Sequence, residues 1–113
     1  MQFMQNKKDE VVVQVMVETI GKIFQFTSDL HNAEEFEKDI ESFDATIMNF
    51  IVLGEAVGKL SLPFKESHAQ VDWHKIYAFR NVLAHDYFGI YPVEVWEIIQ
   101  KHLPKLKAEL ESI

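Results

Sequence analysis

Apolar residues recur at intervals of three and four along most of this chain, which is the spacing of one face of an α-helix. The clearest case is residues 9–26, where the repeating positions are Val12, Val13, Met16, Ile20, Ile23 and Phe24, widened by Val15, Val17 and Phe26. The alternation of apolar and polar residues that is typical of a β-strand is absent from the sequence. The pattern therefore predicts an all-α fold whose long first helix is buried on more than one side.

Capping residues predict where the next two helices begin. Asn32 is followed three residues later by Glu35, the arrangement of an N-cap box, and predicts a short helix at residues 33–40. Ser42 is expected to cap a third helix that continues to about residue 60, with an apolar face that includes Ile47 and Phe50.

Prolines and a further cap divide the second half of the chain. Residues 61–70 contain a proline and are expected to be a loop. Asp72 is expected to cap a helix at residues 73–85. Pro92 suits the first turn of a final helix, and Pro104 predicts a kink or restart within it. Together these segments predict an up-down bundle of about five helices.

Two glycines lie one turn apart in the predicted third helix, at Gly54 and Gly58. In a helix interior each glycine lowers stability by about 1 kcal/mol relative to alanine. We therefore expect another helix to approach the third helix closely at this point.

Length and composition indicate one globular domain, residues 1–113, that is large enough to bury a core. The chain has no cysteine, so it has neither disulfides nor a thiolate metal site. His31, His68, His74 and His102 do not have the spacing of zinc ligands, and we expect no metal and no cofactor. No apolar stretch is long enough to span a membrane, and the first ten residues do not resemble a signal peptide, so we expect a cytoplasmic protein.

The net charge of −7 argues against a protein that holds nucleic acid through bulk positive charge. Any nuclease activity must therefore depend on a local site. The candidate is the sequence Arg80-Asn81-Val82-Leu83-Ala84-His85-Asp86-Tyr87. At about 100° per residue, the side chains of Arg80, Asn81, His85 and Tyr87 share one arc of roughly 160°, provided that the helix continues to Tyr87.

An arginine and a histidine on one helix face suit the cleavage of RNA. The 2′-hydroxyl of RNA is the nucleophile, so the protein needs to supply proton transfer and a cation for the charge on the phosphorane. His85 can exchange protons near neutral pH, and Arg80 offers donors that match phosphate oxygens. Asn81 can orient the imidazole or the phosphate. A two-fold dimer would bring two copies of each residue to one cleft.

The pattern Arg80-Asn81-x-x-Ala84-His85-x-Tyr87 resembles the HepT-like branch of the HEPN ribonuclease superfamily. The resemblance covers about residues 43–110 and includes the preceding Gly-Glu-Ala and the later Val-Trp-Glu-Ile-Ile and Leu-Pro-x-Leu sequences. It implies a helical homodimer and metal-independent endoribonuclease activity that leaves a 2′,3′-cyclic phosphate.

The resemblance also implies a toxin of a type VII-like toxin–antitoxin pair, with Arg80, His85 and Asn81 as the catalytic residues. It implies that a minimal nucleotidyltransferase antitoxin adenylylates Tyr87 and thereby silences the RNase. Glu55 is a candidate for orienting Arg80.

Three alternatives remain open at this point. Arg80 and His85 can form a purely structural helix–helix contact, with Arg80 paired to Glu55 and His85 bonded to a carbonyl. The chain can be a non-catalytic HEPN module that docks a nucleotidyltransferase. It can also be a plain helical dimerisation domain, in which the polar arc is buried and internally satisfied.

Overall fold

Helices account for most of the chain, as the spacing of apolar residues predicted. The computed structural model describes residues 2–113, with side chains described from residue 7 onward, and this part contains no strand. The helices are α1 (Gln2–Thr27), α2 (Ala33–Lys38), α3 (Ile40–Lys59), α4 (Leu62–Ser67), α5 (Trp73–His85), α6 (Pro92–Glu97) and α7 (Leu103–Glu111). None of the helices in the described part has both the length and the apolar character needed to cross a bilayer.

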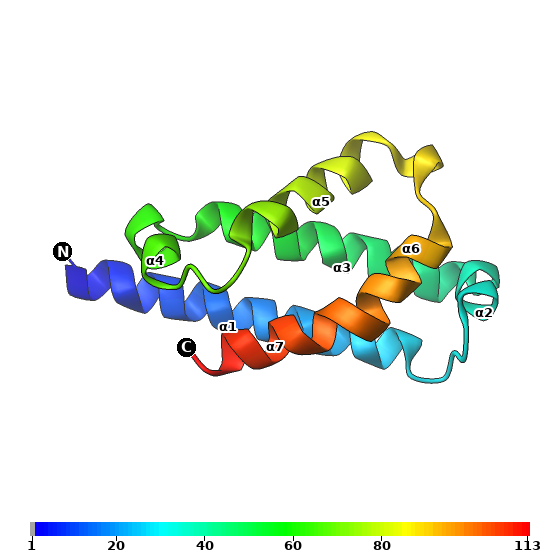
Figure 1. Cartoon of the computed structure of the whole chain (residues 1–113), viewed down its shortest axis with the longest axis horizontal. Coiled ribbons are helices and arrows are strands. Elements are labelled where there is room, and N and C mark those ends of the chain that lie inside the picture. Colours follow the sequence, from blue (N-terminus) through cyan, green and yellow to red (C-terminus); the bar gives the residue numbers. More distant parts are fainter. Residues whose placement is uncertain (1) are drawn as a thin grey trace.

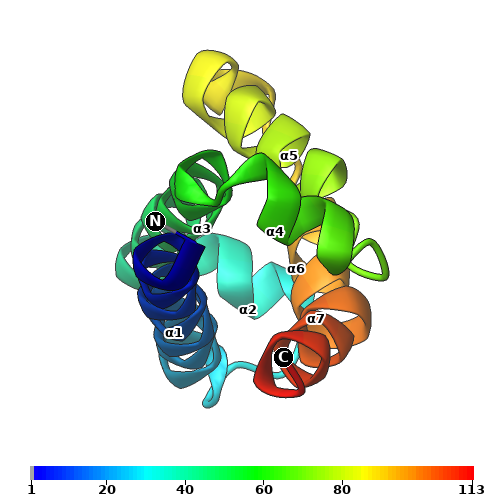
Figure 2. The same cartoon turned by 90° about the vertical axis from the view of Figure 1, so that its left-hand side faces the viewer.

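The long helices α1 and α3 run antiparallel and form the centre of an elongated molecule of 48 × 27 × 21 Å (Figure 1). Helix α7 packs against α1, and α2 packs against α3 and α6 at one end of the bundle. Helix α5 makes its main contacts with α3. Figure 2, which looks along the long axis, shows α5 at the edge of the bundle beside α3. The C-terminal end of α5 lies far from the other helices. Much of the surface of α5 is therefore open.

The core is formed mainly by α1, α3, α6 and α7, with further buried side chains from α2 and α5. Its fully buried side chains include Met16, Ile20, Ile23, Phe36, Leu53, Leu83, Val95, Ile99, Leu103 and Leu110. The predicted apolar stripe of α1 supplies much of this core, but two residues that were expected to widen it are exposed, Val15 at 42% and Phe26 at 39%. They are exposed because α3 and α7 cover only part of the circumference of α1.

Two predictions about element boundaries are wrong. Helix α3 is capped by Asp39 rather than by Ser42, because the Asp39 carboxylate accepts the Ser42 backbone N–H at 3.1 Å and its hydroxyl at 3.0 Å. The segment expected to be a loop contains α4, which Ser61 caps. Pro63 lies in the first turn of α4, where a missing backbone N–H removes no helical hydrogen bond.

The predicted kink or restart near Pro104 is confirmed, because a separate helix, α7, begins at Leu103. The preceding helix widens into a π-helical turn at Ile98–His102, in which the Leu103 N–H bonds to the Ile98 carbonyl. Helix α7 continues directly from this turn, and Pro104 occupies its first turn. The proline is therefore accommodated by a locally wider helix, which is one of the known ways to absorb a missing N–H.

A buried carboxylate on α1 holds the residue that caps α4. Asp9 on α1 is 1% exposed, and it accepts the Ser61 backbone N–H at 2.9 Å and the Ser61 hydroxyl at 2.7 Å. Both carboxylate oxygens thus have a hydrogen-bond partner, as a buried polar group requires. This contact holds the start of α4 against α1.

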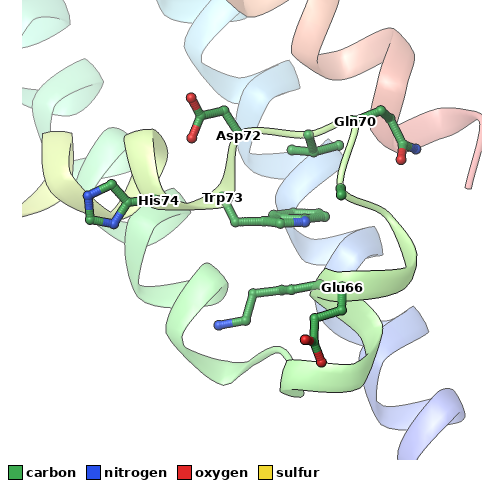
Figure 3. A pocket seen from close by; sticks show the side chains of 8 residues that line it. Glu66, Gln70, Asp72, Trp73 and His74 are labelled. Atoms are coloured by element: carbon green, nitrogen blue, oxygen red, sulfur yellow. The ribbon is translucent and has the colours of Figure 1, made fainter.

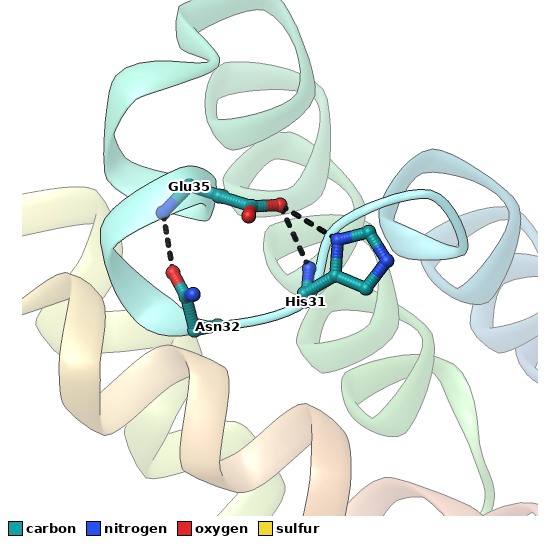
Figure 4. A network of polar contacts seen from close by, with 3 residues as sticks. All are labelled: His31, Asn32 and Glu35. Atoms are coloured by element: carbon teal, nitrogen blue, oxygen red, sulfur yellow. Dashed lines mark hydrogen bonds and ion pairs between the residues drawn. The ribbon is translucent and has the colours of Figure 1, made fainter.

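The start of α2 is fixed by a small polar network (Figure 4). Asn32 accepts the Glu35 backbone N–H at 2.9 Å. The Glu35 carboxylate in turn accepts the His31 backbone N–H at 3.0 Å and lies 3.1 Å from His31 Nδ1. The predicted cap at Asn32 is confirmed. The backbone hydrogen bond from His31, followed by the contact with its ring, lowers the pKa of Glu35 below its usual value of 4.5.

This network predicts a pH-dependent contribution to stability. Because the pKa of Glu35 is lower in the folded chain than in the unfolded chain, its stabilisation is complete above pH 4.5 and is lost as the pH falls through the lower folded value. We expect Glu35→Gln to lower the melting temperature at pH 7, and we expect this difference to shrink well below pH 4.5. Thermal unfolding across this range tests the prediction, with Glu37→Gln on the same helix as a charge-matched control.

Candidate active site

The close approach of α5 to α3 at Gly54 places the candidate catalytic residues. A β-carbon added at Gly54 would lie 2.1 Å from Arg80 Cβ and 2.7 Å from Arg80 Cγ. At Gly58, one turn later, the added carbon would lie 3.4 Å from the Tyr77 ring. The prediction that another helix approaches these glycines is confirmed, and the residue that occupies the space at Gly54 is Arg80.

The Arg80 guanidinium is held by two neighbours. Its Nε donates to Glu55 Oε1 at 3.1 Å, its Nη2 donates to the same oxygen, and its Nη1 donates to Asn81 Oδ1 at 2.7 Å. The guanidinium carbon also lies 6.0 Å from the centre of the Tyr77 ring, within the range of a cation–π contact. The Arg80 side chain remains 23% exposed and that of Glu55 50% exposed. The group is thus oriented at the surface rather than sealed in the core.

His85 is the last residue of α5, and it is exposed. Within the described part of the chain no hydrogen bond of its ring is recorded, so the alternative in which it binds a carbonyl is not observed. Five residues separate it from Arg80, which corresponds to about 7.5 Å along the helix and about 140° around it. Arg80 turns toward α3, and its hydrogen-bond partners are Glu55 and Asn81 rather than His85.

Tyr87 lies outside the helical arc that the sequence suggested. Helix α5 ends at His85, and Tyr87 begins a 3₁₀ turn, Tyr87–Gly89. Its hydroxyl donates to Asp44 Oδ1 on α3 at 2.6 Å. This hydrogen bond to Asp44 is the main reason why the pKa of Tyr87 is raised above its usual value of 10.0. The helical extrapolation from Arg80 to Tyr87 was therefore wrong, because the backbone changes direction after His85.

Sequence reasoning missed Asp44 and Tyr77 as members of this region. A signal for Asp44 was present, since it lies eleven residues before Glu55 and therefore about three helical turns away on the same face. The acids that contact Arg80 and Tyr87 thus lie along one stripe of α3. For Tyr77 the separation of three residues from Arg80 was the corresponding signal.

Apolar side chains are exposed around the same end of α5. Val82 is 55% exposed, Tyr91 67%, Val93 64%, and Phe88 is completely exposed. A fully exposed phenylalanine beside other exposed apolar residues is unusual on the surface of a monomeric protein and is typical of interaction surfaces.

A hollow in the described part of the chain lies away from these residues (Figure 3). It is an open depression between the end of α4 and the start of α5, beside Trp73 and His74. Twelve residues along α5 separate Trp73 from His85, a distance of roughly 18 Å. Among the side chains described, no group of three or more histidine, aspartate or glutamate residues is placed to hold a metal ion.

A comparison with protein families identifies the chain. Residues 16–113, which include α3, α5 and the whole Arg80–Tyr87 segment, match the family described as "Ribonuclease HepT-like". The chain belongs to the HepT-like ribonuclease family. The resemblance found in the sequence is therefore confirmed.

Several curated proteins are similar to this HepT-like chain over most of their length. A "Putative RNase" of Caldanaerobacter subterraneus subsp. tengcongensis is 36% identical over 80 residues, which cover 71% of each chain. A "Putative RNase" of Methanocaldococcus jannaschii is 35% identical over 98 residues, covering 87% of this chain and 80% of the relative. The "Probable ribonuclease HepT" of Thermococcus cleftensis is 29% identical over 98 residues, covering 87% and 88%. No solved structure shows a significant match to the chain.

Proposed function

We propose that this HepT-like chain is a metal-independent endoribonuclease whose catalytic residues are Arg80 and His85, assisted by Asn81. The observation that carries the proposal is that the Arg80 side chain remains partly exposed and His85 is exposed at the end of α5, in a chain whose family and relatives are named as ribonucleases. An accessible pair of this kind is what the cleavage of a large, flexible polyanion requires.

Each residue has a distinct role in the proposed reaction. The RNA 2′-hydroxyl attacks the adjacent phosphorus, the bond to the 5′-oxygen breaks, and a 2′,3′-cyclic phosphate is left. His85 transfers protons at the attacking or the leaving oxygen. Arg80 stabilises the charge that develops on the phosphorane oxygens. Asn81 and Glu55 keep the Arg80 guanidinium in a fixed orientation before RNA binds.

The proposal includes a homodimer, for a geometric reason. Within one copy Arg80 and His85 lie at opposite ends of an arc of about 140° around α5 and share no hydrogen-bond partner, so we propose that a second copy completes the reacting pair. A second copy packed on the open face of α5 would place the Arg80 of one chain near the His85 of the other and would cover exposed apolar residues such as Val82. Two arginines and two histidines would also offset part of the net charge of −7 locally.

We further propose that the chain is the toxin of a toxin–antitoxin pair and that a nucleotidyltransferase antitoxin adenylylates Tyr87. The Tyr87 hydroxyl is at the surface, two residues after His85. A nucleotide attached there would add bulk and negative charge beside the cleft and would repel the RNA backbone.

One observation favours a second candidate function, a non-catalytic module that docks a nucleotidyltransferase. Three of the five guanidinium N–H groups of Arg80 already donate to Glu55 or Asn81, which leaves only two for an RNA phosphate. In this case the chain binds its partner but cuts no RNA.

RNA cleavage in the presence of EDTA separates these possibilities. Purified protein is incubated with a labelled single-stranded RNA, with EDTA or with Mg²⁺, and a His85→Ala chain purified in parallel controls for contaminating nucleases. We expect cleavage that persists with EDTA and leaves cyclic phosphate ends. Cleavage that requires a divalent metal, or that is equal in the His85→Ala preparation, would contradict the proposal, and the absence of cleavage would favour the docking module.

A further inference from the structure

Tyr87 and Asp44 form a polar pair that the cleavage of RNA does not require. The 2.6 Å distance between the Tyr87 hydroxyl and Asp44 Oδ1 lies in the range of charge-assisted O–H···O⁻ bonds. The Tyr87 side chain is 48% exposed, and Asp44 is exposed as well. A molecule in solution can therefore reach the hydroxyl while the hydrogen bond is still in place.

We propose that Asp44 positions the Tyr87 hydroxyl and accepts its proton when the hydroxyl is nucleotidylated. This inference rests on the proposed modification of Tyr87, and it adds that the modified chain itself supplies part of the machinery. Tyr87 Oη forms a bond to the α-phosphorus of a nucleoside triphosphate, and the bond from that phosphorus to the bridging oxygen breaks. Pyrophosphate leaves, and the phenolic proton passes to the Asp44 carboxylate and then to water.

The reaction needs a proton acceptor because the phenol does not ionise by itself near neutral pH. A phenol with a pKa of about 10 is almost completely protonated at pH 7, and the contact with Asp44 raises the pKa of Tyr87 further. A general base has to lie within about 2.6–3.2 Å of the atom whose proton it takes. Asp44 meets this condition before any partner binds.

The surroundings of the pair point to Asp44 rather than to another group. The nearest ionisable neighbours in the sequence are His85 and Asp86 on the same segment and Glu41 one turn before Asp44 on α3. The Asp86 carboxylate is turned toward Gly89: a β-carbon added at Gly89 would lie 2.3 Å from Asp86 Oδ2. Among the residues that the structure describes, the hydrogen bond recorded for the Tyr87 hydroxyl is the one to Asp44.

A phenol-reactive probe that needs no partner protein tests the inference. Benzenesulfonyl fluoride transfers its sulfonyl group to a tyrosine oxygen with loss of fluoride, and the phenolic proton must also be removed. Tyr91 is an internal reference, because it is more exposed than Tyr87, 67% against 48%. The labelling rates of the two tyrosines are measured by peptide mass spectrometry between pH 7 and 9.

At pH 7 we expect Tyr87 to be labelled at least about tenfold faster than Tyr91 in the wild-type chain, with a weak pH dependence. In Asp44→Asn, which keeps an oxygen acceptor but not the base, we expect the two rates to become similar and both to rise about tenfold per pH unit, as for an ordinary phenol. Asp44→Glu keeps a carboxylate and should recover part of the rate. Glu41→Gln, which removes a neighbouring charge on α3, should behave like the wild type.

Equal labelling of Tyr87 and Tyr91 in the wild-type chain would overturn the inference, as would Asp44→Asn labelling Tyr87 as fast as the wild type or faster. Circular dichroism confirms that the variants fold. RNA cleavage by the unlabelled wild-type chain is measured on the same preparation. Failure of the ribonuclease proposal would appear in that assay alone, whereas failure of the inference about Asp44 would appear in the labelling rates.

Discussion

Replacing His85 with alanine is expected to lower the rate of RNA cleavage by about 10²- to 10⁴-fold, the usual contribution of a side chain that transfers a proton in the transition state. Arg80 remains in place in this variant, so the stabilisation of phosphorane charge is retained while proton transfer is lost. Because His85 is exposed at the end of α5, its removal leaves no cavity, and we expect the free energy of unfolding to change by less than about 0.5 kcal/mol.

The matched control for this prediction is His74→Ala. His74 is also exposed on α5 but lies near its N-terminal end, eleven residues before His85. Single-turnover cleavage rates of the two variants are compared with urea unfolding and with sedimentation, which shows whether the oligomeric state is unchanged. A His85→Ala chain that retains most of its activity, or a similar loss in both variants, would remove His85 from the mechanism.

Gly54→Ala is expected to lower the free energy of unfolding by about 1–3 kcal/mol, even though alanine favours a helix over glycine by about 1 kcal/mol. The added β-carbon would lie 2.1 Å from Arg80 Cβ, an atom that cannot move without the backbone of α5. The whole of α5 must therefore shift away from α3. We expect the ion pair between Arg80 and Glu55 to be disturbed, and RNA cleavage to fall together with stability.

Gly21→Ala is the control that separates crowding from helix propensity. Gly21 lies in the middle of α1, and an added β-carbon there would meet no atom within 4 Å. The same substitution should therefore raise stability by up to about 1 kcal/mol. Urea denaturation measures both variants. If Gly54→Ala proves as stable as Gly21→Ala, the helices do not touch at Gly54 as the structure describes.

The fold was largely predictable where it depends on neighbours in the sequence. The spacing of apolar residues predicted α1 and α3, and side-chain caps predicted the starts of α2 and α5, because both signals act over three or four residues. Helix α4 was missed although Ser61 and Pro63 are local start signals, because the proline was interpreted as a sign of a loop. The contact of Ser61 with Asp9, which lies 52 residues earlier in the chain, has no local signal.

The candidate site likewise has some features that the sequence predicted and others that only the tertiary structure revealed. The sequence by itself determined the family and placed Arg80, Asn81 and His85 on one helix, because their spacing is a local property of the chain. Glu55 was already a candidate partner of Arg80 in the sequence, whereas only tertiary structure revealed Asp44 as the partner of Tyr87. Glu55 reaches Arg80 across 25 residues and Asp44 reaches Tyr87 across 43 residues. Gly54 lets α5 lie close against α3 beside Glu55, and the turn after His85 brings Tyr87 to Asp44, so both contacts depend on how separate segments pack.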